Sequence, residues 1–228
     1  MAEILVSGLQ KRFGRQVALR GVSLRVRSGA LVGLVGADGA GKSTLLACIA
    51  GLLQPDEGRV LPAGARDGTI GLARQGFHLY DELSVQENLA FVADLVGLTG
   101  ALRRERIEAA LGASGLRALR NERARNLSGG MRQKLAVVAA VLHEPPVVLL
   151  DEPMTGVDPI SRRELWDLVA ALHAAGRTIV LATADFADAE RCDEVVFLHE
   201  GHVLAQGAPD VLRGEHASLE EAFLEAER

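Results

Sequence analysis

The sequence is poor in cysteine. Its 228 residues include two, Cys48 and Cys192, which lie far apart and lack the spacing of metal ligands. A zinc site and a disulfide framework are therefore not expected. So low a cysteine content fits a reducing compartment.

Long hydrophobic runs are also missing. The longest, at 135–142, is far shorter than the roughly 20 apolar residues of a membrane-spanning helix. The opening residues, MAEI, contain no basic segment ahead of an apolar stretch, so no secretory signal is indicated. We expect a chain that is soluble by itself, with any role at a membrane borrowed from a partner.

An excess of positive charge is lacking as well. The 25 lysines and arginines face 30 aspartates and glutamates, for a net charge of −5. This balance removes the general electrostatic reason to expect nucleic-acid binding. The hydrophobic share of 48% and the charged share of 24% are typical of a globular protein, and the length suits one domain with a small insertion.

Short apolar runs rich in Val, Ile and Leu alternate with longer helical patterns, which predicts an α/β fold with a mostly parallel sheet. The candidate strands are 30–35, 69–73, 147–150, 178–182, 195–199 and 202–206. The stretch from about 84 to 143 has helical spacing and no candidate strand. We interpret it as a helical subdomain inserted between core segments 1–83 and 144–228, the alternative being ordinary crossover helices. The end of the chain, 212–228, predicts one short amphipathic helix.

A glycine-rich segment matches the pattern G-x-x-x-x-G-K-[ST], between the strand at 31–35 and a helical pattern at 44–51. Its glycines let successive backbone N–H groups face one anion, and the helix adds its positive end. Lys42 is expected on the β- and γ-phosphates, and the Ser43 hydroxyl on Mg²⁺. The predicted nucleotide-binding residues are Gly36, Ala37, Asp38, Gly39, Ala40, Gly41, Lys42, Ser43 and Thr44.

Two adjacent carboxylates, Asp151 and Glu152, end the apolar strand at 147–150. Neighbouring residues that leave a strand point in different directions. Asp151 can therefore hold Mg²⁺ while Glu152 orients the water that attacks the γ-phosphate. Acidic residues after a strand also serve as helix caps, but the phosphate-binding pattern in the same chain favours the catalytic interpretation.

A third segment precedes the acid pair and consists of Leu127, Ser128, Gly129, Gly130 and Met131. Ser128 and the glycines open a predicted helix at 131–142 and offer a hydroxyl and free N–H groups to an anion. In this order with the phosphate loop and the acid pair, the segment resembles the signature motif of the ATP-binding subunits of ABC transporters. The resemblance implies a P-loop NTPase fold with a RecA-like core, small antiparallel N-terminal strands, and ATP and Mg²⁺ as cofactors.

The resemblance extends to single residues. Gln75 looks like the Q-loop glutamine, which in the family touches Mg²⁺ or the attacking water and links the nucleotide to the transmembrane partner. Phe13 stands where an aromatic ring stacks on adenine, and phenylalanine keeps the stacking face. Asp158 resembles the D-loop aspartate that crosses the interface between two ATP-binding domains.

One family residue is missing. The family has a histidine on the γ-phosphate just after the strand at 178–182, and the alignment puts Ala184 there. No histidine occurs between His173 and His199. Because such a donor is worth roughly 3 kcal/mol, we expect this chain to bind ATP well and to hydrolyse it slowly. In this loss it resembles the amino-terminal ATPase halves of tandem exporters.

The partners follow from the resemblance to ABC-2 exporters of the multidrug type. ATP would drive dimerisation with a second ATP-binding domain, either another copy or a related ATPase, on the cytoplasmic face of the membrane. Transmembrane permease subunits would dock near Gln75 to Glu87, where apolar and aromatic side chains gather. These are Phe77, Leu79, Tyr80 and Leu83.

Two other functions compete with this one. The first is a soluble ABC-type ATPase that acts on the ribosome or on DNA; a single domain and an acidic balance disfavour it. The second is a P-loop kinase or GTPase, which would leave the segment 127–131 unexplained.

Overall fold

The computed structural model describes residues 3–61, 68–76 and 79–227. Its larger sheet has six strands in the order β5-β6-β7-β3-β8-β9. All neighbouring strands are parallel except β8 and β9, which form an antiparallel hairpin. The strands are β3 (Leu31–Val35), β5 (Ile70–Ala73), β6 (Val147–Asp151), β7 (Thr178–Thr183), β8 (Glu194–His199) and β9 (His202–Gly207). The six candidate strands of the sequence and the mostly parallel α/β sheet are thus confirmed.

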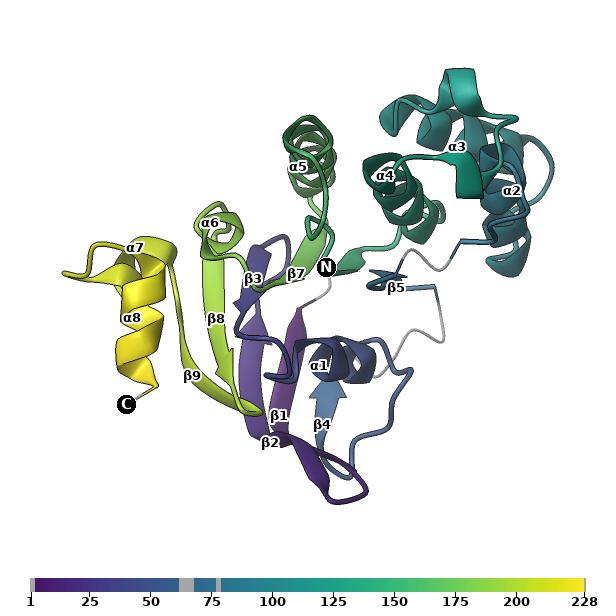
Figure 1. Cartoon of the computed structure of the whole chain (residues 1–228). Helices are drawn as coiled ribbons and strands as arrows, with labels where there is room; N and C mark the ends of the chain where they lie inside the picture. The colour runs from purple at the N-terminus through teal and green to yellow at the C-terminus, as the bar shows by residue number, and fades with distance from the viewer. Residues whose placement is uncertain (1–2, 62–67, 77–78, 228) are drawn as a thin grey trace.

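A second, smaller sheet lies beside it and is antiparallel, in the order β2-β1-β4. Its strands are β1 (Ile4–Phe13), β2 (Gln16–Val26) and β4 (Glu57–Leu61). Helix α1 (Lys42–Ile49) buries Leu45 and Leu46 in a core shared with both sheets. Figure 1 shows α1 in front of these strands. The expected small antiparallel N-terminal strands are therefore present.

The parallel strands contribute to two cores because alternate side chains point to opposite faces of a sheet. In β6, Val147 and Leu149 join the core around α1, whereas Val148 and Leu150 join a core on the other face. That second core is covered by α4 (Gly129–Ala140) and α5 (Pro159–Ala174). Both faces of the sheet are thus buried, as a parallel sheet requires.

All residues from 84 to 143 are described, and none of them forms a strand. They form α2 (Val85–Leu95), α3 (Gly100–Ala113), two short 3-10 turns (Arg117–Leu119 and Ala124–Asn126) and α4. Figure 1 shows these helices together at the end of the molecule opposite the C-terminal helices. The helix predicted at 131–142 begins two residues earlier because Ser128 acts as its N-cap, and it ends two residues earlier, with Val141 as its C-cap.

The prediction of one helix over 212–228 is wrong. The chain forms two, α7 (Pro209–Arg213) and α8 (Leu219–Ala226). Gly214 ends α7 with a φ of 54°, a conformation that suits glycine, and the Ser218 hydroxyl accepts from Glu221 N to start α8. A short helix α6 (Phe186–Ala189) follows β7. Within the described ranges, no helix has the length and apolar character needed to cross a lipid bilayer.

Candidate functional site

The glycine-rich loop joins β3 to α1, and at two of its positions a side chain larger than that of glycine would clash. A Cβ on Gly36 would stand 2.0 Å from the backbone oxygen of Leu198 in β8. A Cβ on Gly41 would stand 2.6 Å from the oxygen of Ala18, and the φ of Gly41 is 108°. Larger residues would push the loop off the sheet, so these glycines allow the close approach that shapes the cradle.

Lys42 lies folded into this cradle with its side chain 5% exposed. Its Nζ donates to the backbone oxygens of Gly36 (2.7 Å) and Ala37 (3.2 Å) and lies 3.1 Å from Glu152 Oε1. The cation therefore stands at the centre of the loop, where an anion bound by the loop's N–H groups could replace these oxygens as its partner.

Ser43 and Asp151 meet beside Lys42, although they lie far apart in the sequence. The Ser43 hydroxyl donates to Asp151 Oδ1 at 3.1 Å. Burial raises the pKa of Asp151, and the hydrogen bond from Ser43 opposes that rise. No group of three or more His, Cys, Asp or Glu in the described part of the chain could hold a metal ion. A hydroxyl and one carboxylate fit Mg²⁺, which takes its remaining ligands from water and phosphate.

Glu152 has a strained backbone, with a φ of 52°. Its Oε2 accepts from the Thr155 hydroxyl (2.8 Å) and from the backbone N–H of Ala184 (3.3 Å). Its Oε1 faces Lys42 but makes no hydrogen bond, although the residue is only 8% exposed. This oxygen is paired with Lys42, so it can accept a hydrogen bond from water when that cation turns to another anion. No sequence motif signals the contacts from Thr155 and the Ala184 backbone.

A cavity of about 510 Å³ opens over these groups. Besides Asp38, Gly39, Gly41, Lys42, Ser43 and Thr44 it is lined by Phe13, Gln16, Ala18, Gln75 and Glu152. The fold therefore brings Phe13 and Gln75 to the phosphate loop. Phe13 is 50% exposed, and Lys11 Nζ lies 5.8 Å from the centroid of its ring, so the residue is accessible to a planar ligand. Gly36 and Ala40 are buried beneath the loop, and Ala37 is exposed on it.

The segment 127–131 lies against the start of α5. Ser128 Oγ accepts from Met131 N at 3.3 Å and caps α4. A Cβ on Gly130 would stand 2.3 Å from Ser161 Cβ, so the two helices touch here. Asp158 caps α5 by accepting from Ile160 N and Ser161 N at 3.0 Å each. Neither Asp158 nor any residue of 127–131 is among the residues that line the cavity.

Ala184 follows β7 at the expected place, next to Glu152. Its side chain lines a second cavity of about 690 Å³, together with Thr155, Gly156 and Asp185. A methyl group donates no hydrogen bond, so from this position the backbone N–H is the group that reaches Glu152.

Taken together, a strand, a glycine-rich loop holding a lysine, a helix and an acid pair on the neighbouring strand define a P-loop nucleotide-binding domain. Comparison with known proteins gives the family. The family model described as "ABC transporter" matches residues 19–155. The chain belongs to this family, as an ATP-binding domain of its ATPase class.

Three relatives illustrate the match. The chain is 41% identical over 221 residues to the probable multidrug ABC transporter ATP-binding protein YbhF of Escherichia coli, covering 92% of this chain and 38% of that protein. It is 36% identical to the Nod factor export ATP-binding protein I of Rhizobium sp. (strain N33), covering 92% and 72%. A solved dimeric structure of MJ0796, a bacterial ABC transporter cassette, matches with a TM-score of 0.83 and 27% identity, covering 90% and 98%.

Proposed function

We propose that this chain binds Mg²⁺-ATP in the cavity over the phosphate loop, hydrolyses it slowly, and energises export by a membrane permease. The observation that carries the proposal is the convergence of Lys42, Gln75 and Glu152 on one cavity beside the Ser43–Asp151 pair. Charge, hydroxyl and carboxylate stand there in the combination that phosphoryl transfer to water requires.

Each residue has a role in this proposal. Phe13 stacks on the adenine, and the loop 36–43 with Thr44 binds the phosphates through backbone N–H groups. Lys42 exchanges its contact with Glu152 for the β- and γ-phosphates. Ser43 and Asp151 hold Mg²⁺, with Gln75 on the metal or the water. Glu152 orients the attacking water through Oε1.

Hydrolysis requires a second ATP-binding domain. The segment 127–131 presents a helix start capped by Ser128, and the first N–H groups of a helix have no acceptor within it, as an anion site needs. Its residues are nevertheless not among those lining the chain's own cavity. Across a dimer interface it would complete the site of the partner domain, with Asp158 beside it. The dimeric arrangement of the similar MJ0796 cassette supports this proposal. The second domain is another copy of this chain or a related ATPase.

Slow turnover follows from Ala184. With a methyl group at the switch position, the γ-phosphate loses one side-chain donor in the transition state, and such donors are worth roughly 3 kcal/mol. Asp185 adds a negative charge nearby, although Arg162 pairs with it. The site would therefore keep ATP bound and hydrolyse it only slowly.

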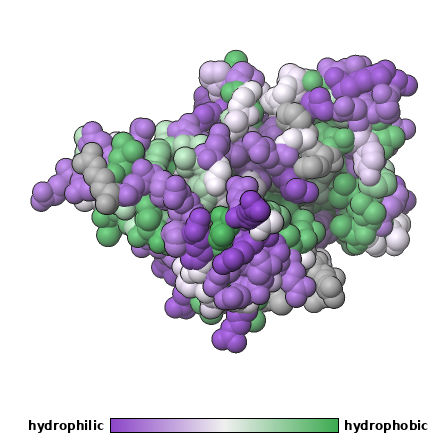
Figure 2. Space-filling model, turned by 60° about the horizontal axis from the view of Figure 1, so that its bottom comes forward, coloured by the Kyte–Doolittle hydropathy of each residue, from purple (hydrophilic) through white to green (hydrophobic). Residues whose placement is uncertain are grey.

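The proposed permease contact is an apolar cavity of about 300 Å³ between β5 and α2. Leu79, Tyr80, Phe91 and Leu95 are among its lining residues, and Tyr80 and Leu95 are largely exposed. Figure 2 shows hydrophobic surface gathered at this side of the molecule, on the right. Leu83 is half-buried outside this cavity, and Phe77 lies outside the described residues. Segment 84–143 would act as a helical subdomain and 1–83 with 144–228 as the catalytic core, and this surface lies where the two meet.

The similarity to proteins named for multidrug transport and Nod factor export supports export and a place at the cytoplasmic face of the membrane. It also disfavours an ATPase acting on the ribosome or DNA. The chain spans 38% of the length of YbhF.

The test is steady-state ATP hydrolysis by the purified chain at concentrations that support dimers. Glu152→Gln should abolish turnover, while the matched surface variant Glu190→Gln leaves it unchanged. Ala184→His should raise kcat by about 100-fold, since it restores one donor worth roughly 3 kcal/mol to the transition state. Ala187→His, at an exposed position of helix α6, controls for added imidazole.

Turnover in Ala184→His equal to that of the parent would contradict the slow-site proposal and favour a working homodimer. Turnover that Glu152→Gln leaves intact would contradict the assigned role of Glu152. Addition of a related ATPase with a complete switch loop then separates a homodimer from a heterodimer.

A further inference from the structure

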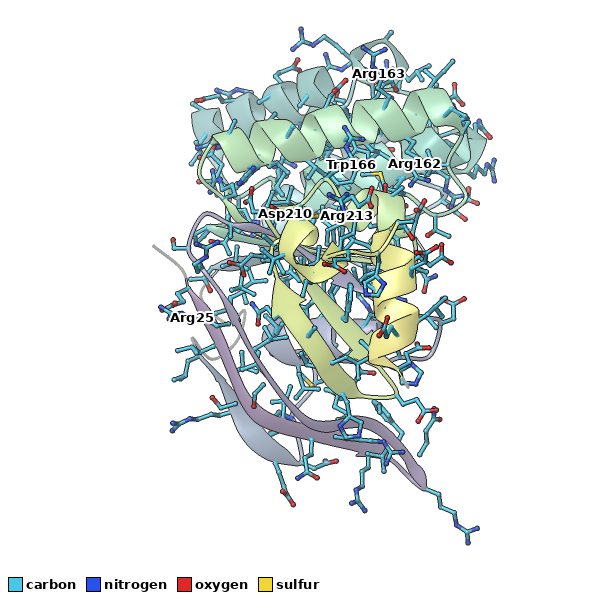
Figure 3. The ribbon with its side chains drawn as sticks, turned by 90° about the vertical axis from the view of Figure 1, so that its left-hand side faces the viewer. Arg25, Arg162, Arg163, Trp166, Asp210 and Arg213 are labelled. Atoms are coloured by element: carbon cyan, nitrogen blue, oxygen red, sulfur yellow. The ribbon has the colours of Figure 1, made fainter. Side chains whose placement is uncertain are left out.

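A buried carboxylate lies behind the switch loop and outside the nucleotide cavity. Asp188 on α6 is 2% exposed. Its Oδ1 accepts from Arg162 Nη2 at 2.6 Å and from Trp166 Nε1 at 3.0 Å, both on α5. Figure 3 shows Arg162 and Trp166 on the side of α5 toward the C-terminal helices and Arg163 on its outer side. A buried charge with two donors from another helix is held in one orientation.

The other oxygen of Asp188 continues the network into the switch loop. Thr183 Oγ1 lies 3.4 Å from Asp188 Oδ2, and the backbone N–H of Asp185 donates to the same hydroxyl at 3.0 Å. A carboxylate oxygen can only accept, so the single hydroxyl hydrogen of Thr183 points to Asp188 while the oxygen accepts from the Asp185 N–H. Arg162 also pairs with the Asp185 carboxylate. The residues on both sides of Ala184 are therefore fixed.

Ala184 lies between these two anchored residues, and its own N–H points to Glu152 Oε2 at 3.3 Å. The backbone N–H of Glu152 in turn donates to Ala182 O at 3.0 Å. The position of the switch-loop backbone thus determines a hydrogen bond on the carboxylate proposed as the base. Arg162, Trp166 and Asp188 are not among the residues that line the nucleotide cavity.

We propose that Arg162, Trp166 and Asp188 are positioning residues that hold the switch loop through Thr183, so that the Ala184 backbone N–H orients Glu152. In this chain the Ala184 backbone N–H, held in place by the network on the far side of the switch loop, donates to Oε2 of Glu152. The other oxygen, Oε1, then faces the attacking water. The proposal rests on the function proposed above for Glu152 and adds a specific route from α5 to it.

The same contacts provide a probe. Trp166 is the sole tryptophan of the chain, it is 4% exposed, and its ring lies 4.2 Å from the Arg191 guanidinium. Because Trp166 Nε1 donates to Asp188, movement of the switch loop changes the polar surroundings of the Trp166 ring. Binding of Mg²⁺-ATP is expected to shift Trp166 fluorescence, and the shift requires no turnover.

The experiment compares variants with matched controls in the full chain. Thr183→Val keeps the side-chain shape in β7 but breaks the link, and Thr178→Val removes a buried hydroxyl from the other end of the same strand. Arg162→Gln breaks the clamp, Arg162→Lys keeps the charge, and Arg163→Gln changes the exposed neighbour. We measure kcat, KM for ATP, and the nucleotide-induced shift of Trp166 emission.

Thr183→Val and Arg162→Gln should lower kcat about tenfold with KM changed less than twofold, and Arg162→Lys should recover part of the loss. Thr178→Val and Arg163→Gln should behave like the parent. The Trp166 shift on Mg²⁺-ATP should vanish in Thr183→Val and persist in Thr178→Val. Thermal melting shows whether each variant is still folded. A variant that does not fold is replaced by Asp188→Asn, which keeps the side-chain shape.

Equal kcat losses in the variants and their controls would overturn the proposal, as would a loss confined to KM. A parent without hydrolysis attributable to Glu152 contradicts the proposed function alone. In that case the Trp166 fluorescence tests the positioning role by itself. The role is overturned if Thr183→Val leaves the ATP-induced shift intact. It is also overturned if the parent binds ATP without any shift.

Discussion

At the scale of single residues, the two adjacent glycines of the segment 127–131 have different surroundings. A Cβ on Gly130 would lie 2.3 Å from both Cβ and Oγ of Ser161, whereas a Cβ on Gly129 has no neighbour within 4 Å. Gly130 is therefore the residue that lets α4 touch the start of α5, and it ties the segment to the Asp158 cap.

We expect Gly130→Ala to destabilise the fold by about 1–3 kcal/mol, the usual cost of overpacking a well-packed site. The matched variant Gly129→Ala should be neutral or slightly stabilising, because alanine favours a helix over glycine by about 1 kcal/mol. Urea unfolding of both variants checks this. Equal midpoints for the two variants would contradict the close contact, and Ser161→Gly in the Gly130→Ala background should restore part of the stability.

At the scale of secondary-structure elements, the start of α2 is closed by a reciprocal pair. Ser84 Oγ accepts from Glu87 N, and Glu87 Oε2 accepts from Ser84 N. The hydrogen bond from the Ser84 backbone N–H, helped by the Ser84 side chain, lowers the pKa of Glu87 below its ordinary value. The capping box fixes where the helical stretch begins, directly after the loop that carries Tyr80.

Ser84→Ala should therefore cost about 1 kcal/mol of stability. Thr99 is the N-cap of α3 but its side chain makes no capping hydrogen bond, so Thr99→Ala should change stability by less than about 0.5 kcal/mol. The comparison is made by thermal unfolding at fixed protein concentration. A larger loss in Thr99→Ala than in Ser84→Ala would count against the capping box as a stabilising element.

At the scale of the whole molecule, the two cysteines report on separate parts of the core. Cys48 lies in the core around α1, and Cys192 in the core on the other face of the sheet, where its Sγ would be 3.2 Å from a Cβ on Gly33. Burial raises the pKa of Cys48 to about 11 and that of Cys192 to about 12. Neither thiol is available as a thiolate near neutral pH.

Consequently both cysteines should resist alkylation at pH 8 in the folded protein and react fully in denaturant, where the thiol pKa returns to about 8.5. Mass spectrometry after iodoacetamide treatment counts the modified thiols, and digestion locates them. Rapid labelling of one thiol in native buffer would show that its side of the sheet opens on its own.

The sequence by itself determined the local chemistry of this protein. The loop 36–43, the strand ending in Asp151 and the capped segment 127–131 follow from short patterns whose geometry is set by neighbouring residues. The main strands were equally predictable, because a sheet buried on both faces needs continuous apolar runs. The break at Gly214 between α7 and α8 was not predictable in this way, since apolar residues at helical spacing do not show where a turn interrupts the helix.

Only the tertiary structure decided which distant residues meet. That Phe13 and Gln75 line one cavity depends on how the small sheet packs beside the large one. That Ala184 still serves Glu152 depends on a backbone N–H, a group every residue except proline carries and therefore no motif records. The link from Arg162 through Asp188 and Thr183 spans α5, α6 and β7. It exists because the packing of these three elements places the Asp188 carboxylate within hydrogen-bond distance of both side chains.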